Sequence, residues 1–531
     1  MTGGEPGGGA GTARQRRERS ARLGAVACFV FAVVHLLVVF ARAPVLPEDD
    51  AFITMRYAAN LAGGDGFVYN AGERVLGTTS PLFALLLVPV ARVAGAAALP
   101  AAAVWWNAGL MLAVALVVVR LLRSFAVAAP LAYLAGAWLL LEPTGIMVGL
   151  GGMDTWLASC LALAAFLAGS ERRWELAAGL AAVACVARPE GAFVLAGLAW
   201  AYLRCGSPRR LRVAASAGLP LLAWVGFATV YFGSPVPQSL RAKLAPLYVP
   251  PHGESLAAIG RTLGEALFGS GSPAAVFAAS VLAALLLGLV LRRSRTRPVL
   301  AALAAYFLLV LAELAIGNPG WAPWYPVLLL APLTVAVFVG LAEAGELAAG
   351  HGPIAAWAPG LLAWILVAAA GVGDLAVIAL PNWPATAYRV FTPYRLRTLA
   401  YRDAAAWIGR RAPAGTTIVA SEIGCLGFNA LEDRIVDAAA LVSPQAQRFL
   451  PVRGPESPYG GAIAPGLVRL TRPAFVVTLP MYGGLLRADG EFMRSYRLVT
   501  RVPVPGEVRQ GYSLDVYRRA GADGGVGRVW R

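Results

Sequence analysis

Charged residues are scarce in this chain of 531 residues: they make up 14% of it, whereas hydrophobic residues make up 58%. Soluble domains carry roughly 25% charged residues, so this composition excludes an ordinary soluble protein. Cysteine and histidine are also rare, with five and three residues. Only Cys425 lies beyond residue 380, so the last part of the chain can form no disulfide of its own, and the distant histidines argue against a zinc site.

Long apolar runs take the place of charge between residue 24 and residue 380. A helix that crosses a bilayer needs about 20 mostly apolar residues, so we expect an α-helical polytopic membrane protein with about 11 transmembrane helices. The runs are Gly24–Val39, Pro81–Leu99, Val104–Val119, Phe125–Leu141, Thr155–Leu167, Trp174–Ala187, Ala192–Leu203, Val213–Phe232, Pro273–Leu291, Val299–Ile316, Tyr325–Leu341 and Ile354–Leu380.

The formal net charge of +16 is carried in part by arginines that cluster between the apolar runs. The positive-inside rule accounts for such clusters, so we expect no nucleic-acid partner. All clusters fall on one side if Pro81–Leu99, which contains Pro89 and Arg92, is a re-entrant or juxtamembrane helix. This topology predicts a multi-pass plasma (inner) membrane protein with a cytoplasmic N-terminus and an exoplasmic or periplasmic C-terminal domain.

Three regions follow from these patterns. Residues 1–23 read as a disordered basic cytoplasmic tail, and residues 24–380 as a transmembrane domain with a first exoplasmic loop at 43–80. Residues 381–531 combine an amphipathic helix at Leu399–Arg411 with short strands, which predicts a small α/β domain. The strands are expected at Thr416–Ser421, Ile435–Val436, Ala474–Leu479, Tyr496–Val504 and Ser513–Arg519.

An aspartate pair, Asp49 and Asp50, stands shortly after the first apolar run. Carboxylates at the edge of a membrane are costly to desolvate, so such a pair is a candidate functional site. The alternative is that the pair caps the helix that follows, because acidic residues are favoured at a helix N-terminus. One aspartate would suffice for capping.

Other polar and aromatic residues fall in loops on the same predicted face of the membrane. Asp154 stands before a span and could equally cap it. A basic residue on the side where positive charge is disfavoured is a candidate phosphate ligand, although Arg188 could instead pair with Glu190. The full set is Asp154, Arg188, Glu190, Lys243, Trp324 and Tyr325, of which the two aromatics could also be interfacial anchors.

The stretch from Asp49 to Pro81 resembles the first exoplasmic loop of the C-type (GT-C), polyprenyl-phosphate-dependent membrane glycosyltransferases. Within that family it is most similar to terminal arabinofuranosyltransferases of actinobacterial cell walls. Further segments resemble the family in order along the chain: Gly152-Met153-Asp154-Thr155, in which Asp154 replaces the more usual glutamate, Arg188-Pro189-Glu190-Gly191, Tyr231-Phe232-Gly233-Ser234-Pro235 with Lys243, and Ser421-Glu422-Ile423-Gly424.

The resemblance implies an inverting transfer in which a carboxylate takes the proton of an acceptor hydroxyl and positive charge stabilises the departing lipid phosphate. It implies Asp49 as the general base, with Asp50 positioning the donor or acceptor. We expect Arg188, Lys243 and Arg56 to bind the donor phosphate. The acceptor or auxiliary residues are expected to be Asp154, Glu190, Trp324 and Tyr325. A divalent cation (Mg²⁺, Mn²⁺ or Ca²⁺), held by Asp49, Asp50 and Asp154, stays an open alternative.

The sequence therefore predicts transfer of a sugar, with arabinofuranose suggested by the nearest resemblance, from a polyprenyl-phosphate donor to a cell-envelope glycan or glycolipid. A transporter or flippase for lipid-linked sugars is one alternative, and a protein mannosyltransferase or oligosaccharyltransferase is another. A transporter would need polar residues at mid-depth in many spans and internal repeats, which the sequence lacks. The C-terminal domain has no catalytic motif, so we expect it to guide the acceptor, or to act as a lid or stabilising cap.

Overall fold

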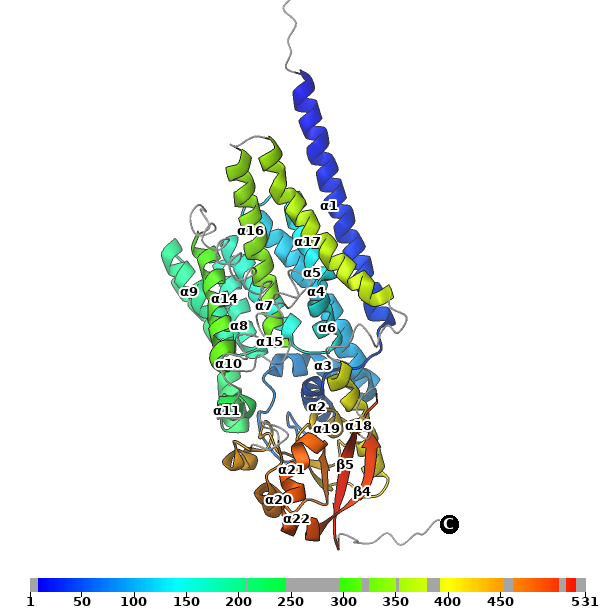
Figure 1. Ribbon diagram of the computed structural model, residues 1–531. Coiled ribbons are helices and arrows are strands. Elements are labelled where there is room, and N and C mark those ends of the chain that lie inside the picture. The colour runs from blue at the N-terminus through cyan, green and yellow to red at the C-terminus, as the bar shows by residue number, and fades with distance from the viewer. Residues whose placement is uncertain are drawn as a thin grey trace, which may run out of the picture.

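The computed structural model describes residues 8–206, 208–244, 297–317, 324–349, 353–379, 392–452, 462–505 and 512–521. A tall helical bundle stands on a small α/β domain, with short helices between them (Figure 1). The bundle contains α1 (Gly8–Arg42), α4 (Leu99–Ser124), α5 (Ala129–Leu141), α6 (Pro143–Leu150), α7 (Thr155–Ser170), α8 (Trp174–Ala187), α9 (Gly191–Cys205), α10 (Arg210–Phe232), α14 (Arg297–Gly317), α15 (Trp324–Val327), α16 (Leu330–Ala349) and α17 (Pro353–Ala379).

Several bundle helices suit a bilayer by length and composition. Within the described ranges, five qualify: Glu18–Arg42, Ala96–Ser124, Arg210–Phe232, Pro298–Ile316 and Leu330–Ala348. The pair α5 and α6, bent by 51°, would be a sixth. The expected polytopic α-helical membrane protein with a C-terminal α/β domain is therefore confirmed, while the number of 11 spans stays a prediction. The run Pro273–Leu291 lies outside the described residues.

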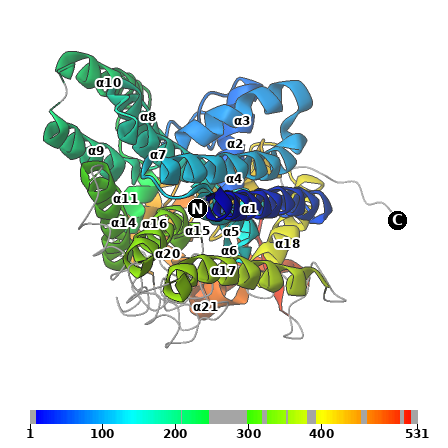
Figure 2. The same ribbon diagram turned by 90° about the horizontal axis from the view of Figure 1, so that it is seen from above.

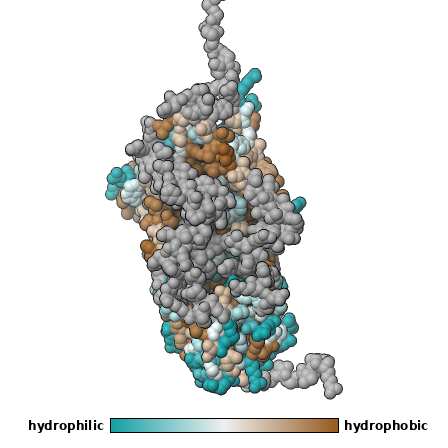
Figure 3. Space-filling model, in the orientation of Figure 1, coloured by the Kyte–Doolittle hydropathy of each residue, from teal (hydrophilic) through white to brown (hydrophobic). Residues whose placement is uncertain are grey.

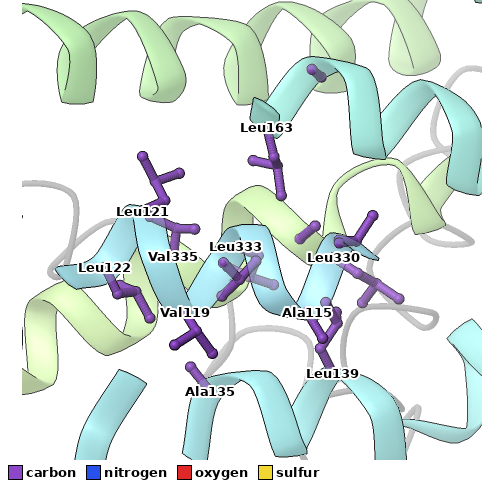
Figure 4. Packing of buried hydrophobic residues seen from close by; sticks show 14 of the residues in the cluster. Ala115, Val119, Leu121, Leu122, Ala135, Leu139, Leu163, Leu330, Leu333 and Val335 are labelled. Atoms are coloured by element: carbon purple, nitrogen blue, oxygen red, sulfur yellow. The ribbon is translucent and has the colours of Figure 1, made fainter. Parts of the chain in front are cut away.

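Small and branched apolar residues close the centre of the bundle. In Figure 4, side chains of α4, α5, α7 and α16 meet there, among them Ala115, Val119, Ala135 and Leu333. Small residues such as alanine allow helix backbones to approach closely, which is how membrane helices pack in the absence of a hydrophobic driving force between them. Hydrophobic residues are also exposed on the outside of the bundle, whereas hydrophilic ones gather at the end formed by the α/β domain (Figure 3).

Two details of the bundle differ from our expectations. The basic segment 1–23, which we expected to be disordered, is helical from Gly8 onward as the first part of α1, and residues 1–7 lie outside the described residues. Arginine is among the better helix formers, so a helix nucleated by the apolar run can extend back through it. The segment between the runs Phe125–Leu141 and Thr155–Leu167 contains a further helix, α6, whose N-cap Glu142 is completely buried and accepts hydrogen bonds from the amides of Thr144 and Gly145.

Four short elements lie between the bundle and the α/β domain: α2 (Asp49–Gly63), α3 (Pro81–Ala94), the 3₁₀ helix η1 (Ala96–Ala98) and α11 (Gln238–Leu244). Buried α3 residues such as Phe83 and Leu87 share a cluster with α2 and with the α/β domain. Seen from above, α2 and α3 lie to one side of α1 and α4 (Figure 2). This packing favours the juxtamembrane interpretation of Pro81–Leu99.

The C-terminal domain is a mixed five-stranded sheet with strand order β2-β1-β3-β5-β4. The strands β2, β1 and β3 are parallel, and β5 pairs antiparallel with both β3 and β4. The expected helix and strands are all present. Their bounds are α18 (Thr392–Gly409), β1 (Thr417–Ala420), α19 (Gly424–Phe428), β2 (Arg434–Asp437), η2 (Pro444–Phe449), α20 (Pro465–Thr471), β3 (Phe475–Thr478), α21 (Pro480–Ala488), α22 (Gly490–Ser495), β4 (Tyr496–Pro503) and β5 (Ser513–Arg519).

A buried ion pair fixes this domain to the first loop. The guanidinium of Arg395 on α18 lies 2.6 Å from the Glu48 carboxylate, and both side chains are nearly inaccessible to solvent. The same arginine donates to the carbonyl of Met147 on α6. One side chain thus ties the α/β domain to the first loop and to the bundle, so the three parts can build a common site.

Candidate functional site

A pocket lies where the first loop, the bundle and the α/β domain meet. It brings together most of the polar residues that the sequence singles out, although these come from distant parts of the chain. Its walls are formed by Asp50, Ile53, Thr54, Gly77, Thr78, Thr79, Met153, Asp154, Arg188, Ser239, Lys243, Trp324, Tyr325 and Leu441. Residues that the sequence analysis placed in loops on one face of the membrane therefore meet in this pocket.

Asp50 is the aspartate of the pair that faces this pocket. It occupies the second position of α2, and Thr54, one helical turn later, lines the same wall. Burial raises the pKa of the Asp50 carboxyl above its usual range, the charge of Lys243 lowers it, and the charge of Asp154 raises it. Asp50 is thus a carboxylate with increased basicity beside a cation.

Asp49 points to the α/β domain instead. Its two carboxylate oxygens accept hydrogen bonds from the backbone amides of Gly424 (2.9 Å) and Cys425 (2.8 Å) at the start of α19. A side chain at Gly424 would collide with the Asp49 backbone, so glycine is required there. Burial and the charge of Glu422 raise the pKa of Asp49 to about 8, although the two amides lower it. Asp49 therefore caps α19 of the α/β domain, whereas the capping alternative placed it on the helix that follows the pair.

Arg188 is held between two carboxylates. Its Nη1 lies 3.1 Å from Oδ1 of Asp154, and its Nη2 lies 2.8 Å from Oε1 of Glu190. All three side chains are at least nine-tenths buried. The expected alternative of an Arg188–Glu190 pair is present, and Asp154 joins it. Among the described residues, Asp154 makes no side-chain cap to α7, so the capping alternative for this aspartate is wrong.

Lys243 and Tyr325 line the pocket together and contact each other. The ammonium group of Lys243 donates to the Tyr325 hydroxyl at 2.5 Å, and the Arg188 guanidinium lies over the same aromatic ring. Trp324, beside Tyr325, accepts a hydrogen bond at its carbonyl from the Thr155 hydroxyl. Both aromatic residues therefore take part in the pocket.

Arg56 is located away from the pocket. It is fully buried and donates to backbone carbonyls of the α/β domain, at 3.0 Å from Ala430 and 2.7 Å from Asp433, with a further bond to Gly427. It also stacks over the Tyr69 ring. Seven residues, close to two full turns, separate Asp49 from Arg56, so both face the α/β domain. Arg56 thus joins the first loop to that domain.

Hydroxyl groups are the part of the pocket that sequence reasoning missed. The hydroxyls of Thr54 and Thr78 lie 3.1 Å apart, and Thr79 and Ser239 also line the walls. The helical period offers a signal: Thr54 follows Asp50 by four residues, and Ser239 precedes Lys243 by four. In the described part of the chain, no three His, Cys, Asp or Glu side chains are grouped closely enough to hold a metal ion. The carboxylates of Asp49, Asp50 and Asp154 therefore do not form a ready-made cation site there.

The architecture is similar to that of solved structures with the GT-C fold. The structure of ArnT from Cupriavidus metallidurans, solved with undecaprenyl phosphate bound, matches with a TM-score of 0.57 and 13% identity, covering 93% of this chain and 98% of that one. The oligosaccharyltransferase AglB from Archaeoglobus fulgidus, solved with an inhibitory peptide and a dolichol-phosphate, matches with a TM-score of 0.52 and 11% identity, covering 86% and 69%. The expected GT-C fold is confirmed, and at these identities the likeness concerns the fold alone.

Other similarities are narrower. The mycobacterial arabinofuranosyltransferase AftD matches at 17% identity with a TM-score of 0.43, over 93% of this chain and 41% of that one, which is too low to support an argument about the sugar. Residues 390–517 match a family model described as a domain of unknown function, DUF8728. No curated protein sequence matches the chain.

Proposed function

We propose that this protein is a membrane glycosyltransferase that takes a sugar from a polyprenyl-phosphate donor. The observation that carries the proposal is a single pocket in which a carboxylate, Asp50, lies close to a cation, Lys243, at the junction of the bundle with the first loop. The fold supports it, because one protein of this fold was solved with undecaprenyl phosphate and another with a dolichol-phosphate.

The reaction needs a base and a stabilised leaving group. The acceptor oxygen forms a bond to the anomeric carbon of the sugar on the face opposite the phosphate, and the bond from that carbon to the phosphate oxygen breaks. Asp50 takes the acceptor proton, and the lipid phosphate departs with the bonding electron pair. Lys243, supported by Tyr325, stabilises the charge on that phosphate.

Asp50 is favoured over Asp49 as the base by the contacts of the two carboxylates. Both oxygens of Asp49 are engaged by backbone amides of α19, and the acceptor would have to displace them. Asp50 lies in the pocket wall, and its raised pKa makes it a better proton acceptor than an ordinary aspartate. Asp49 then fixes the position of Asp50 by anchoring the start of α2.

Lys243 is favoured over Arg188 as the main phosphate ligand. Asp154 and Glu190 together carry enough negative charge to balance the Arg188 guanidinium. In our proposal, Arg188 holds Asp154 in the pocket, where the Asp154 carboxylate orients an acceptor hydroxyl beside Asp50. Glu190 then acts through Arg188. The rings of Trp324 and Tyr325 supply apolar surface for a sugar.

The finer features of the activity come from the resemblance of the first loop. Arabinofuranose is the first donor sugar to test, and a cell-envelope glycan or glycolipid is the first acceptor. We propose that the pocket opens on the exoplasmic side of the plasma membrane, with the N-terminus in the cytoplasm. The α/β domain contributes Leu441 to the pocket, so it acts at least as a wall of the site.

The test is transfer by the purified, full-length protein. It is incubated with a panel of polyprenyl-phosphate sugars and candidate acceptors, with and without a chelator, and release of the lipid phosphate is followed. We expect release with at least one donor in the wild type and none with Asp50→Asn. A lipid-linked sugar that crosses the proteoliposome membrane without release of lipid phosphate, at the same rate in Asp50→Asn as in the wild type, would support the transporter alternative. That result would refute the proposal.

A further inference from the structure

The Ser239 side chain has an unusual position in the pocket. The residue is 4% exposed and lines the pocket wall. Its hydroxyl oxygen is buried and has no hydrogen-bond partner among the described residues. Buried polar groups nearly always have a partner, so an unpartnered hydroxyl in a pocket wall points to a ligand as its partner. The hydroxyl of Ser239 is therefore available to a bound molecule.

Ser239 and Lys243 belong to the same face of α11. They are four residues apart in a helix, so their side chains project to the same side about one turn apart. The helix is held at its start by Gln238, whose backbone N–H donates to the carbonyl of Leu76 at 2.6 Å. The Gln238 side chain also donates to the carbonyl of Ala440 at 3.2 Å. The first loop and the α/β domain thus fix the direction in which Ser239 and Lys243 point.

A second polar pair lines the pocket from another helix. Asp50 and Thr54 are also four residues apart and both line the pocket from α2. An anion is repelled by the carboxylate of Asp50 and attracted by the ammonium of Lys243. An anionic group in the pocket is consequently best placed against α11, within reach of both of its polar side chains.

We propose that Ser239 binds the phosphate of the lipid-linked donor together with Lys243. The serine hydroxyl donates a hydrogen bond to one phosphate oxygen while the lysine ammonium contacts another. Phosphate has several acceptor oxygens, and hydrogen bonds to an ionised acceptor are stronger than neutral ones. This inference rests on the proposed function. It assigns binding of the donor phosphate to a residue that the sequence motifs did not single out.

The experiment measures binding of sugar-free undecaprenyl phosphate to the full-length protein in detergent. Ser239→Ala should weaken this binding by roughly 10-fold or more, the equivalent of one hydrogen bond to a charged group. Ser239→Thr keeps the hydroxyl and should retain most of the affinity. The matched control is Ser159→Ala on α7, which also removes a buried hydroxyl that is unpartnered among the described residues, but outside the pocket wall. That control should bind as the wild type does.

The outcomes separate the inference from the proposed function. Wild-type affinity in Ser239→Ala, with weakened binding in Lys243→Gln, would overturn the role of Ser239 and leave the function intact. A Ser239→Ala variant that affects only sugar-bearing donors would also overturn it, because the hydroxyl would then contact the sugar. If the wild type neither binds the lipid phosphate nor releases it from any donor, the proposed function itself fails. A lower melting temperature with equal losses in Ser239→Thr would show a structural role and likewise refute the inference.

Discussion

Exchanging the aspartates of the first loop one at a time for asparagine should separate catalysis from domain docking. The two side chains are adjacent in sequence but have different partners: Asp49 accepts from two backbone amides of α19, and Asp50 faces the pocket. Asparagine has nearly the shape of aspartate, so each exchange changes charge and hydrogen bonding rather than packing. We expect Asp50→Asn to be folded and inactive, and Asp49→Asn to be less stable and still active.

The magnitudes follow from the contacts. Loss of a positioned base lowers the rate by roughly 10²–10⁴, so Asp50→Asn should reduce turnover to that extent with an unchanged melting temperature. In Asp49→Asn the side-chain oxygen can still accept from one amide, but its NH₂ group opposes the other. Leaving one buried amide unsatisfied costs about 1–3 kcal/mol, and for a unit of 150–250 residues each kcal/mol lowers the melting temperature by about 2–4 °C.

Three measurements test this pair: release of lipid phosphate, melting in detergent, and limited proteolysis of the α/β domain. The domain should become more sensitive to protease in Asp49→Asn and stay resistant in Asp50→Asn. The opposite result would refute the reasoning. An inactive Asp49→Asn with wild-type melting, beside an active Asp50→Asn, would make Asp49 the base, as the family resemblance alone implies.

Three further predictions concern charge. The pKa of Asp49 in the folded protein, about 8, lies above its usual value. The stability that this group contributes is therefore full below about pH 4 and is lost as the pH rises to about 8. Over this pH range the melting temperature should fall less in Asp49→Asn than in the wild type. Arg188→Gln leaves the buried Asp154 and Glu190 carboxylates unbalanced and should cost about 3–5 kcal/mol in stability, with binding of undecaprenyl phosphate less affected than in Lys243→Gln. A greater loss of binding in Arg188→Gln would return the phosphate role to the arginine. Arg56→Met removes donors to the carbonyls of the α/β domain and should make that domain more sensitive to protease. The uncleaved protein should bind lipid phosphate with unchanged affinity. Protease resistance equal to that of the wild type would contradict the docking role.

Much of the architecture follows from local patterns in the chain. The strands of the α/β domain occur within a residue or two of their expected positions, because each is a short apolar or β-branched run between turn signals. The helix α6 was missed for a physical reason as well. The N-cap of this helix is Glu142, whose carboxylate accepts hydrogen bonds from two backbone amides of the next turn. In the sequence alone, a carboxylate at this position indicates the polar end of a span and not a buried cap.

The assignment of roles within the aspartate pair needed tertiary structure. Adjacent residues on a helix point about 100° apart, so Asp49 and Asp50 had to face different surroundings once the helix began at Asp49. The helical period groups Asp49 with Arg56 and Asp50 with Thr54, but it leaves open which group meets a pocket. The deciding partners of Asp49 are amides of Gly424 and Cys425, more than 370 positions along the chain. Periodicity therefore sorts the loop residues into two faces, and only the docking of the α/β domain determines that the face of Asp50 is the one left open for chemistry.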